Sequence, residues 1–314
     1  MKPYRSILSV PGHIQKMHIK AAESVADVIM LDLEDSVPQE AKEDARMQVL
    51  KSLQTIDWQK KTISIRINGL DTPYAYRDLL EIVEGAGEKV HSIVVPKVNH
   101  PGDIHFVERM LDGIEQARQL SGTIGIEASI ETAEGLAEVR AIAAAGRRLR
   151  SLVFGIADYS ASVGARLVSI SGHGENEAHI YPGHRWHFAL SRIVMAAKAH
   201  GLLAIDAPYG HFKDIEGLQQ SAVMAGALGC DGKWAIHPTQ IETINRVFSP
   251  SQEDIDRAVT VLQAFQAAKQ QSRGAIAVEG RMVDQATLRM AQRLYDQARY
   301  LGLVKAGGET DTSD

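Results

Sequence analysis

Short apolar segments recur along the chain, and stretches with helical spacing, such as Ile14–Ser24 and Ala133–Ala145, separate them. Several of these segments are continuous apolar runs instead of alternating ones, which is typical of strands buried on both faces. The eight segments are Ser6–Val10, Val25–Leu33, Thr62–Ile67, Ser92–Pro96, Thr123–Ala128, Ser151–Phe154, Leu202–Asp206 and Gly232–Ile236.

Repeated strand–helix units predict a parallel sheet with helices outside it. Eight such units favour closure into a (β/α)₈ TIM barrel, with a doubly wound open sheet as the alternative. Polar and charged residues follow the strands directly, so a barrel would gather them on the rim where barrel enzymes carry their active sites. The irregular, Gly-, His- and Ser-rich stretch Ser169–His184 is predicted to be a long loop on that rim.

The chain is expected to continue beyond the barrel. We predict a catalytic barrel domain over residues 1–248, a helical lid or oligomerisation segment over 249–303, and a disordered tail over 304–314. Ser249 is the predicted N-cap of the first C-terminal helix, with Pro250 at its first helical position.

Composition limits the class of protein. A chain of 314 residues with 45% hydrophobic residues can bury a large core, and its net charge of −5 does not indicate a nucleic-acid partner. The one cysteine, Cys230, allows no disulfide within the chain and no Cys-based zinc site, which fits a reducing compartment. No apolar run approaches a membrane span, and the first residues lack the features of a signal peptide, so a cytoplasmic protein is expected.

Two carboxylates follow neighbouring predicted strands. Glu131 comes after the fifth strand and Asp158 after the sixth. Adjacent strands lie about 4.8 Å apart, so both side chains can share a small hard cation. Mg²⁺ prefers one or two carboxylates together with substrate oxygens and water. The alternative is that each residue caps the helix that follows it.

Arg66 stands at the end of an otherwise apolar strand, where an unpaired charge is costly. Arginine keeps its charge, so this side chain suits an oxyanion or a carboxylate. The alternative is an ion pair inside the barrel with Asp32 or Glu34. The same two interpretations apply to Lys97 after the fourth strand.

The acidic run from Asp32 to Asp35 follows the second strand. Alternation sends Asp32 and Glu34 to the same side of the chain, where they either hold metal-bound water or orient Arg66. Asp35 has a second interpretation as the cap of the next helix.

The first strand-to-helix turn contains Pro11-Gly12-His13, with Lys16 shortly after it. Glycine lets the backbone approach a ligand and lysine suits phosphates. The turn matches no nucleotide-binding fingerprint, and an ordinary connection is the alternative.

Taken in order, these motifs resemble the HpcH/HpaI aldolase–citrate lyase β-subunit superfamily, and within it the malyl-CoA and citramalyl-CoA lyases. The resemblance runs nearly end to end, from Arg5 to about Leu303. The motifs are Arg5-Ser6, Val10-Pro11-Gly12, Leu31-Asp32-Leu33-Glu34-Asp35-Ser36-Val37, Arg66-Ile67-Asn68-Gly69-Leu70-Asp71-Thr72, Val95-Pro96-Lys97, Ile130-Glu131-Thr132-Ala133, Phe154-Gly155 leading to Asp158-Tyr159, and Trp234-Ala235-Ile236-His237-Pro238.

The resemblance implies specific roles. Glu131 and Asp158 are expected to bind Mg²⁺, with Mn²⁺ as another possible ion, and Arg66 to bind the thioester oxygen and stabilise an enolate. Residues expected to bind substrate or coenzyme A are Arg5, Pro11, Lys16, Arg66, Lys97 and Pro208. Three acidic residues are expected to position the metal- and substrate-binding side chains without binding the ligand themselves: Asp32, Glu34 and Asp35.

The segment from Gly280 to Asp284 resembles the family's Gly-x-Met-x-Asp signature. The resemblance implies that Asp284 is an acid/base supplied by the next subunit of a homotrimer or hexamer. A helix N-cap is the alternative role.

The implied reaction is Mg²⁺-dependent cleavage of (S)-citramalyl-CoA to acetyl-CoA and pyruvate. The alternatives are a malyl-CoA or β-methylmalyl-CoA lyase that releases glyoxylate, a malyl-CoA thioesterase, and a citryl lyase similar to the citrate lyase β-subunit. A non-catalytic subunit on a barrel scaffold is the remaining hypothesis, because a fold does not fix a function.

Overall fold

The strands form a closed parallel barrel. The computed structural model describes residues 3–59, 61–165, 185–270, 276–278 and 281–304. Eight strands pair in chain order, and β1 pairs with β8 to close the barrel, which confirms the predicted TIM barrel. The strands are β1 (Ser6–Pro11), β2 (Val28–Asp32), β3 (Thr62–Arg66), β4 (Ser92–Val95), β5 (Gly125–Ile130), β6 (Leu149–Phe154), β7 (Leu203–Asp206) and β8 (Gly232–Ala235).

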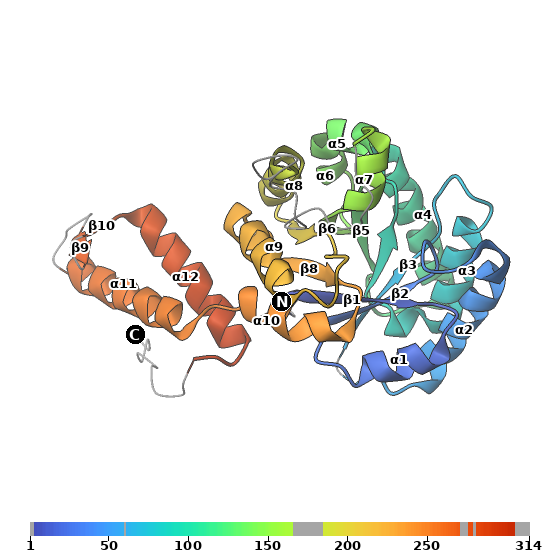
Figure 1. Ribbon diagram of the computed structural model, residues 1–314, viewed down its shortest axis with the longest axis horizontal. Helices are drawn as coiled ribbons and strands as arrows, with labels where there is room; N and C mark the ends of the chain where they lie inside the picture. Colours follow the sequence, from blue (N-terminus) through green and yellow to red (C-terminus); the bar gives the residue numbers. More distant parts are fainter. Residues whose placement is uncertain (1–2, 60, 166–184, 271–275, 279–280, 305–314) are drawn as a thin grey trace. The chain divides into compact units, whose positions relative to one another are not determined.

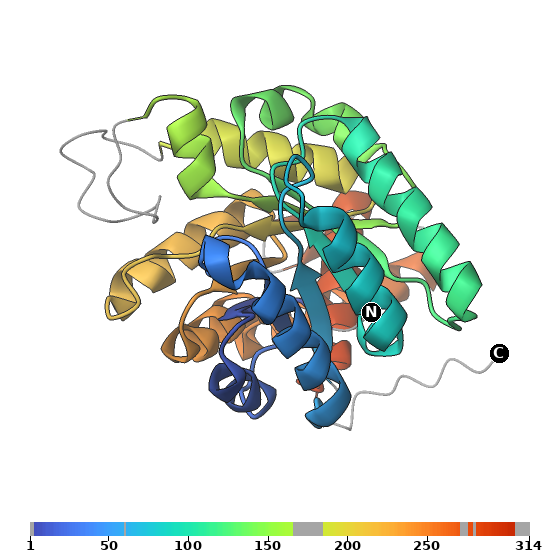
Figure 2. The same cartoon turned by 90° about the vertical axis from the view of Figure 1, so that its right-hand side faces the viewer.

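Helices lie outside the strands (Figures 1 and 2). They are α1 (Gln15–Ala22), α2 (Lys42–Thr55), α3 (Ala75–Ala86), α4 (Pro101–Arg118), α5 (Ala133–Ala137), α6 (Val139–Ala143), α7 (Ile156–Ser162), α8 (His187–Ala199), α9 (Ile215–Leu228) and α10 (Ile241–Val247). Short 3₁₀ turns occupy Gln39–Ala41, Gly87–Lys89 and Pro238–Gln240. The helical stretch predicted over Ala133–Ala145 is two short helices, because Glu138 leaves the helical conformation at φ −90° and ψ 3°.

The barrel interior is apolar in its middle and polar at both ends. Its central cluster contains Ile7, Val28, Met30, Val94, Val153, Ile205 and Trp234. Side chains alternate along a strand, so a residue two positions beyond a core residue also points inward. Asp32 follows Met30 in this way, and its side chain is completely buried. The interior therefore becomes polar at the carboxyl ends of the strands.

A second polar group closes the amino-terminal end of the barrel. The fully buried Glu127 accepts hydrogen bonds from Tyr4 (2.8 Å), Ser92 (2.6 Å) and Ser151 (3.0 Å). Burial raises the pKa of Glu127, although these three hydroxyl donors oppose the shift. Because the lone pairs of Glu127 are used by side chains of the barrel itself, we assign this end of the barrel a structural role and not a ligand-binding one.

The C-terminal part of the chain is a second compact unit, and the division falls between Asn245 and Arg246. It contains α11 (Gln252–Gln270), β9 (Ile276–Val278), β10 (Arg281–Val283) and α12 (Gln285–Tyr300). The two strands pair antiparallel as a hairpin between the helices (Figure 1), which the sequence pattern did not predict. The unit has its own core, formed by Ala258, Val261, Phe265, Val283 and Ala291.

The predicted start of α11 is wrong by two residues. Ser251, not Ser249, occupies the capping position: its hydroxyl accepts a hydrogen bond from the amide of Asp254 (3.1 Å), and its carbonyl accepts one from Ile255 (3.0 Å). Pro250 therefore precedes the helix and fixes the approach of the chain instead of opening its first turn.

The predicted rim loop Ser169–His184 and the predicted tail from residue 305 onward lie outside the described residues. In the part of the chain that is described, no helix combines the length and the apolar character of a membrane span.

The core accounts for the stability of the barrel. Ile7 is completely buried and belongs to the interior cluster. We expect Ile7→Ala to lower the free energy of unfolding by about 2–5 kcal/mol, because it removes buried methyl groups and leaves a cavity. Urea unfolding followed by circular dichroism measures this loss. Met195→Ala, at a side chain that is 60% exposed, is the matched control and should change stability by less than about 0.5 kcal/mol. Equal effects of the two variants would contradict this assignment of the core.

Candidate active site

Arg66 lies at the carboxyl end of β3 and forms a two-bond ion pair with Asp32 at the end of β2. Its Nε and Nη2 each donate to one carboxylate oxygen of Asp32 at 2.6 Å. The two residues are paired across the strands in register. Such a fork fixes the plane of the guanidinium as well as its position. The alternative of an ion pair inside the barrel is therefore observed, and it leaves one edge of the guanidinium for other contacts.

That remaining edge meets further carboxylates. Nη1 of Arg66 lies 2.9 Å from Glu34 and 3.4 Å from Asp35, and the guanidinium carbon lies 5.5 Å from the centre of the Trp234 ring. Burial alone would lower the pKa of Arg66, but Asp32 and the other carboxylates raise it further above its ordinary value. Arg66 is a permanent cation between an aromatic face and an acidic loop.

Asp32 also shapes the loop that carries its acidic neighbours. Its carboxylate accepts hydrogen bonds from the amides of Glu34 (2.9 Å) and Ser36 (3.1 Å) and from the Ser36 hydroxyl (2.5 Å). Burial would raise the pKa of Asp32, but Arg66 and these donors lower it below the ordinary value. Asp32 is thus an ionised anchor whose lone pairs are taken by the protein.

Asp35 does not cap the helix that follows it. Helix α2 begins at Lys42 and has no side-chain cap. The Asp35 side chain is 58% exposed, and its nearest charged partner is Arg66. The capping interpretation of Asp35 is therefore wrong.

Lys97, after β4, contacts carboxylates on both sides of it: Glu34 after β2, and Glu131 and Asp158 after β5 and β6. Its amide donates to Oε1 of Glu131 (2.7 Å), and its Nζ lies 2.5 Å from Glu34 and 3.2 Å from Asp158. Burial would lower the pKa of Lys97, but its bond to Glu34 and the surrounding carboxylates raise it. Its φ of 51° lies in the left-handed region, which costs a side-chain-bearing residue on the order of 1–3 kcal/mol. The backbone is strained at the point where Lys97 reaches three carboxylates.

Glu131 lies in a recess that only a glycine can form. A Cβ atom on Gly155 would stand 2.1 Å from Oε2 of Glu131, so any side chain at position 155 would displace the carboxylate. Gly155 also precedes α7, whose first turn carries Asp158. The glycine therefore brings the Glu131 carboxylate against the start of the helix that bears the second predicted metal ligand.

Neither predicted ligand caps its helix. Thr132, not Glu131, is the N-cap of α5 and accepts a hydrogen bond from the amide of Gly135 (2.9 Å). Asp158 lies inside α7 without a capping bond. Both capping alternatives are therefore wrong, and the two carboxylates face Lys97 instead of the starts of their helices.

The donor set fits a small hard cation. Oε1 of Glu131 accepts the Lys97 amide, while Oε2 lies in the Gly155 recess. Among the described residues no group of three or more His, Cys, Asp and Glu side chains is arranged to hold a metal by itself. A cation here would take Glu131 and Asp158 from the protein and its remaining ligands from substrate and water, which is the pattern Mg²⁺ prefers.

The charges around Glu131 and Asp158 also favour a bound divalent cation. Five carboxylates surround two cations, Arg66 and Lys97. The carboxylates are Asp32, Glu34, Asp35, Glu131 and Asp158. Burial, together with the charge of Glu34, raises the pKa of Glu131 to about 7, although Arg66 and Lys97 oppose the shift. The excess of negative charge would be relieved by a divalent cation.

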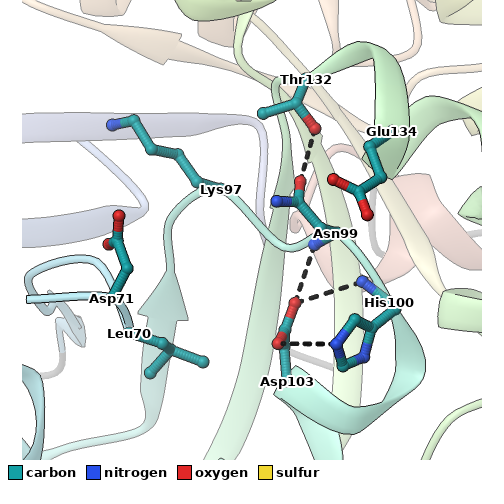
Figure 3. Close-up of a pocket in the computed structure, with 8 residues that line it drawn as sticks. All are labelled: Leu70, Asp71, Lys97, Asn99, His100, Asp103, Thr132 and Glu134. Atoms are coloured by element: carbon teal, nitrogen blue, oxygen red, sulfur yellow. Dashed lines mark hydrogen bonds and ion pairs between the residues drawn. The ribbon is translucent and has the colours of Figure 1, made fainter.

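A cavity of about 350 Å³ opens beside Lys97, between the loops that follow β3, β4 and β5. In Figure 3, Asn99 and Thr132 lie together on one side, and the Lys97 amine points away from them. Three carboxylates line the cavity, namely Asp71, Asp103 and Glu134. Lys97 and His100 also line the cavity, so carboxylates outnumber its one lysine.

The remaining predicted residues lie in two places. Pro11 ends β1, the exposed Lys16 is in the first turn of α1, and the half-buried Pro208 follows β7, so all three belong to the carboxyl-end rim. Arg5 instead precedes β1 at the opposite end of the barrel, where it pairs with Asp27 through two side-chain bonds of 2.8 Å. The structure therefore removes Arg5 from the site, because its guanidinium is used to join the starts of β1 and β2.

The sequence analysis assigned no role to two supporting residues, His18 and Gly155, although Gly155 lies in one of the motifs that carry the family resemblance. His18, completely buried in α1, lies 3.0 Å from the Pro11 carbonyl and 2.8 Å from the Ser52 hydroxyl, and so fixes the first turn. Gly155 gave no periodic or charge signal, because its role is the absence of a side chain. A histidine on the buried stripe of a helix was the available signal for His18.

Asp284 belongs to the C-terminal unit and is the N-cap of α12. Its carboxylate accepts the amide (2.9 Å) and hydroxyl (3.0 Å) of Thr287, and these bonds lower its pKa. The capping alternative is therefore observed, and a catalytic role for Asp284 stays a prediction.

Glu131 gives the metal-free barrel a pH dependence of known sign. Its folded-state pKa of about 7 lies above the ordinary value of 4.5, so the folded protein keeps a proton that the unfolded chain has released. Its contribution to stability is fully present below about pH 4.5 and is lost as pH rises through about 7, by on the order of 3 kcal/mol at most. Urea unfolding in EDTA at about pH 5 and pH 8 measures this decline, which Glu131→Gln should remove. Glu134→Gln, at an exposed neighbour, is the control, and an unchanged decline in Glu131→Gln would refute the assignment.

The Gly155 recess predicts opposite signs for two glycine substitutions. Gly155→Ala should lower the free energy of unfolding by about 1–3 kcal/mol, because its methyl group overlaps the Glu131 carboxylate. Gly113→Ala, in the interior of α4 with no atom within 4 Å of the new methyl group, should raise it by about 0.5–1 kcal/mol. Thermal unfolding compares the two, and a neutral Gly155→Ala would mean that the recess is not required.

Comparison with known proteins now identifies the family. Residues 5–238 match the family model described as HpcH/HpaI aldolase/citrate lyase. The chain is 40% identical over 305 residues to an L-malyl-CoA/β-methylmalyl-CoA lyase of Cereibacter sphaeroides, covering 96% of each chain. It is 33% identical over 315 residues to a malyl-CoA/β-methylmalyl-CoA/citramalyl-CoA lyase of Chloroflexus aurantiacus, covering 96% of this chain and 89% of the relative.

A solved structure agrees with these relatives. Protein CitE from Mycobacterium tuberculosis, determined in complex with magnesium, acetoacetate and coenzyme A, matches with a TM-score of 0.73 and 28% identity over 95% of this chain and 98% of that one. The predicted class of activity, a carbon–carbon lyase, is confirmed at the level of the family. The chain belongs to the HpcH/HpaI aldolase/citrate lyase family.

Proposed function

We propose that this protein is a Mg²⁺-dependent lyase that cleaves a malyl-CoA-type thioester into acetyl-CoA or propionyl-CoA and glyoxylate. The observation that carries the proposal is the juxtaposition of Arg66, fixed by Asp32, with the recessed carboxylate of Glu131 across the Lys97 loop. A fixed cation beside a hard-cation site is what cleavage of a 3-hydroxyacyl thioester to an enolate requires.

The bond changes assign a task to each end of the site. The substrate hydroxyl loses its proton, its oxygen becomes the aldehyde oxygen of glyoxylate, and the electrons of the broken carbon–carbon bond form the thioester enolate, whose later protonation at carbon balances the proton lost. A bound Mg²⁺ would polarise the hydroxyl and carboxylate of the acid end. Protonation of the enolate carbon completes the reaction, and no oxidant or other co-reactant is consumed.

Glu131 and Asp158 would hold the cation, and Arg66 would stabilise the negative charge that develops on the thioester oxygen. Because Asp32 fixes the guanidinium before the reaction starts, no reorientation is needed when the enolate forms. Lys97 lies within 3.2 Å of Asp158 and 2.5 Å of Glu34, so it is placed to receive the substrate carboxylate beside the cation.

The direction of coenzyme A binding follows from charge. The acidic cavity beside Lys97 disfavours phosphates. The exposed Lys16 on α1, together with Pro11 and Pro208, lies on the β7–β8–β1 side of the rim. We place the phosphorylated end of the thioester there. A neighbouring copy of the chain would supply Asp284 as the group that protonates the enolate carbon, which requires a homo-oligomer such as a trimer or hexamer.

Citramalyl-CoA is a second candidate substrate. The Chloroflexus relative includes citramalyl-CoA in its name, and (S)-citramalyl-CoA, which would give acetyl-CoA and pyruvate, is the substrate that the family resemblance implied. The extra methyl group of citramalyl-CoA is worth about 1–3 kcal/mol of discrimination, so one site can accept both thioesters.

The lyase proposal has a direct assay. Purified protein with Mg²⁺ should release glyoxylate from malyl-CoA and β-methylmalyl-CoA, or pyruvate from citramalyl-CoA, as the phenylhydrazone, and EDTA should stop the release. Free thiol appearing from malyl-CoA without acetyl-CoA would establish a thioesterase instead. No keto acid from any of the three thioesters would end the lyase proposal.

Arg66 gives a second test. Arg66→Lys keeps the charge but loses the two-bond contact with Asp32, so kcat should fall by about 10²–10³-fold. Arg77→Lys, at a guanidinium that is 54% exposed on α3, is the matched control and should leave kcat unchanged. Equal activity of the two variants would exclude Arg66 from the reaction.

A further inference from the structure

Helix α2 carries two buried cations on the face that packs against the barrel. Lys42 and Arg46 are four residues apart and are 7% and 3% exposed. They share a stripe with the buried apolar residues Ala45, Val49 and Leu53. Charges in such a position are costly unless they make specific contacts. The contacts that compensate the burial of Lys42 and Arg46 therefore indicate what these two cations do.

Lys42 holds the backbone of the acidic loop after β2. Its Nζ donates to the carbonyl oxygens of Leu33 (2.9 Å) and Glu34 (2.7 Å). Burial lowers the pKa of Lys42, although the carboxylates of Asp32 and Glu34 oppose the shift. Because the ammonium binds main-chain oxygens, it fixes the path of the chain that sends the Glu34 carboxylate to Arg66 and Lys97.

Arg46 holds the loop after β3 through an intermediate carboxylate. Its Nε donates to Oδ1 of the fully buried Asp78 on α3 (2.8 Å). The other oxygen of Asp78 accepts the amide (3.0 Å) and the side-chain amide (2.7 Å) of Asn68. Asn68 is two residues beyond Arg66, so this chain of bonds fixes the strand end from which Arg66 projects.

We propose that Lys42 and Arg46 are positioning residues of the active site, through which one helix sets the two rim loops on either side of Arg66. The inference rests on the proposed lyase function for its kinetic consequence. It assigns a role to buried residues that would otherwise be regarded as part of the packing between α2 and the barrel.

The chain supplies a control for the purely structural alternative. Arg148 is also 3% exposed and is bound by Asp112 (2.6 Å) and Glu115 (2.5 Å), but it precedes β6 at the opposite end of the barrel. Arg148→Met removes a buried, paired cation without touching the rim. Its effect on stability shows what such a loss costs when no catalytic group depends on it.

The experiment measures kcat, KM and the melting temperature of Lys42→Met, Arg46→Met and Arg148→Met on whichever thioester the wild-type protein cleaves. The two α2 variants should lose about 10²-fold in kcat with KM changed only a few-fold, since a displacement of about 1 Å has that cost. Arg148→Met should lose comparable stability and keep the wild-type kcat. Wild-type kcat in the α2 variants, or a parallel loss in Arg148→Met, would overturn the proposal.

A double-mutant cycle tests the route through Asp78. Asp78→Asn and Arg46→Met act on one bonded chain, so the double variant should lose no more kcat than either single variant. Losses that multiply would show that the two residues act separately, and would overturn the route from Arg46 to Asn68.

A crystal structure of Lys42→Met separates this inference from the proposed function. If the wild-type protein cleaves none of the thioesters, the lyase proposal fails, and the structure still decides the positioning role. The proposal requires the Glu34 carboxylate to move away from Arg66, and an unmoved loop would overturn it. Lys42→Leu, which lacks a donor as Lys42→Met does, serves in the same way if Lys42→Met does not fold.

Discussion

The two-bond ion pair between Arg66 and Asp32 is the interaction on which the rest of the site depends. It joins the carboxyl ends of β2 and β3 at 2.6 Å, in a position where both partners are buried. Asp32 also accepts the amides of the acidic loop, so the same carboxylate fixes the guanidinium and the chain that surrounds it. Leaving either charge alone in this place would be strongly destabilising, and the pair therefore specifies one arrangement of the rim.

The excess of carboxylates around this pair connects the geometry to the proposed chemistry. Arg66 and Lys97 do not balance the surrounding acids, and the pKa of Glu131 near 7 expresses that imbalance as well as burial. A site of this kind gains from a divalent cation, which would offset the excess negative charge before a substrate carboxylate binds beside Glu131. Two local features allow the Glu131 carboxylate to take its position: the strained backbone of Lys97, whose amide it accepts, and the absence of a side chain at Gly155.

The barrel, and the gathering of Arg66, Lys97, Glu131 and Asp158 at one rim, could be predicted from the sequence because their signals are local. Continuous apolar runs mark the strands, and these four residues lie at or shortly after strand ends. Their metal-binding and catalytic roles came from the family resemblance and stay predictions. Other features depend on contacts between distant segments. Arg5 looks like a ligand-binding cation until its pairing with Asp27 is seen, and Lys42 looks like a surface residue until its bonds to the β2 loop are seen. The start of α11 was misplaced because Ser249-Pro250 and Ser251 offer two similar capping patterns, and only the hydrogen bonds distinguish them.

The central claim is that Glu131 and Asp158 share a cation beside Arg66, and a crystal structure with Mg²⁺ and glyoxylate tests it most directly. The account predicts one Mg²⁺ bound by both carboxylates, with glyoxylate completing its coordination, Arg66 still paired with Asp32, and Lys97 Nζ moved from Asp158 toward the ligand. A metal bound elsewhere, or glyoxylate held without Glu131 and Asp158, would contradict it.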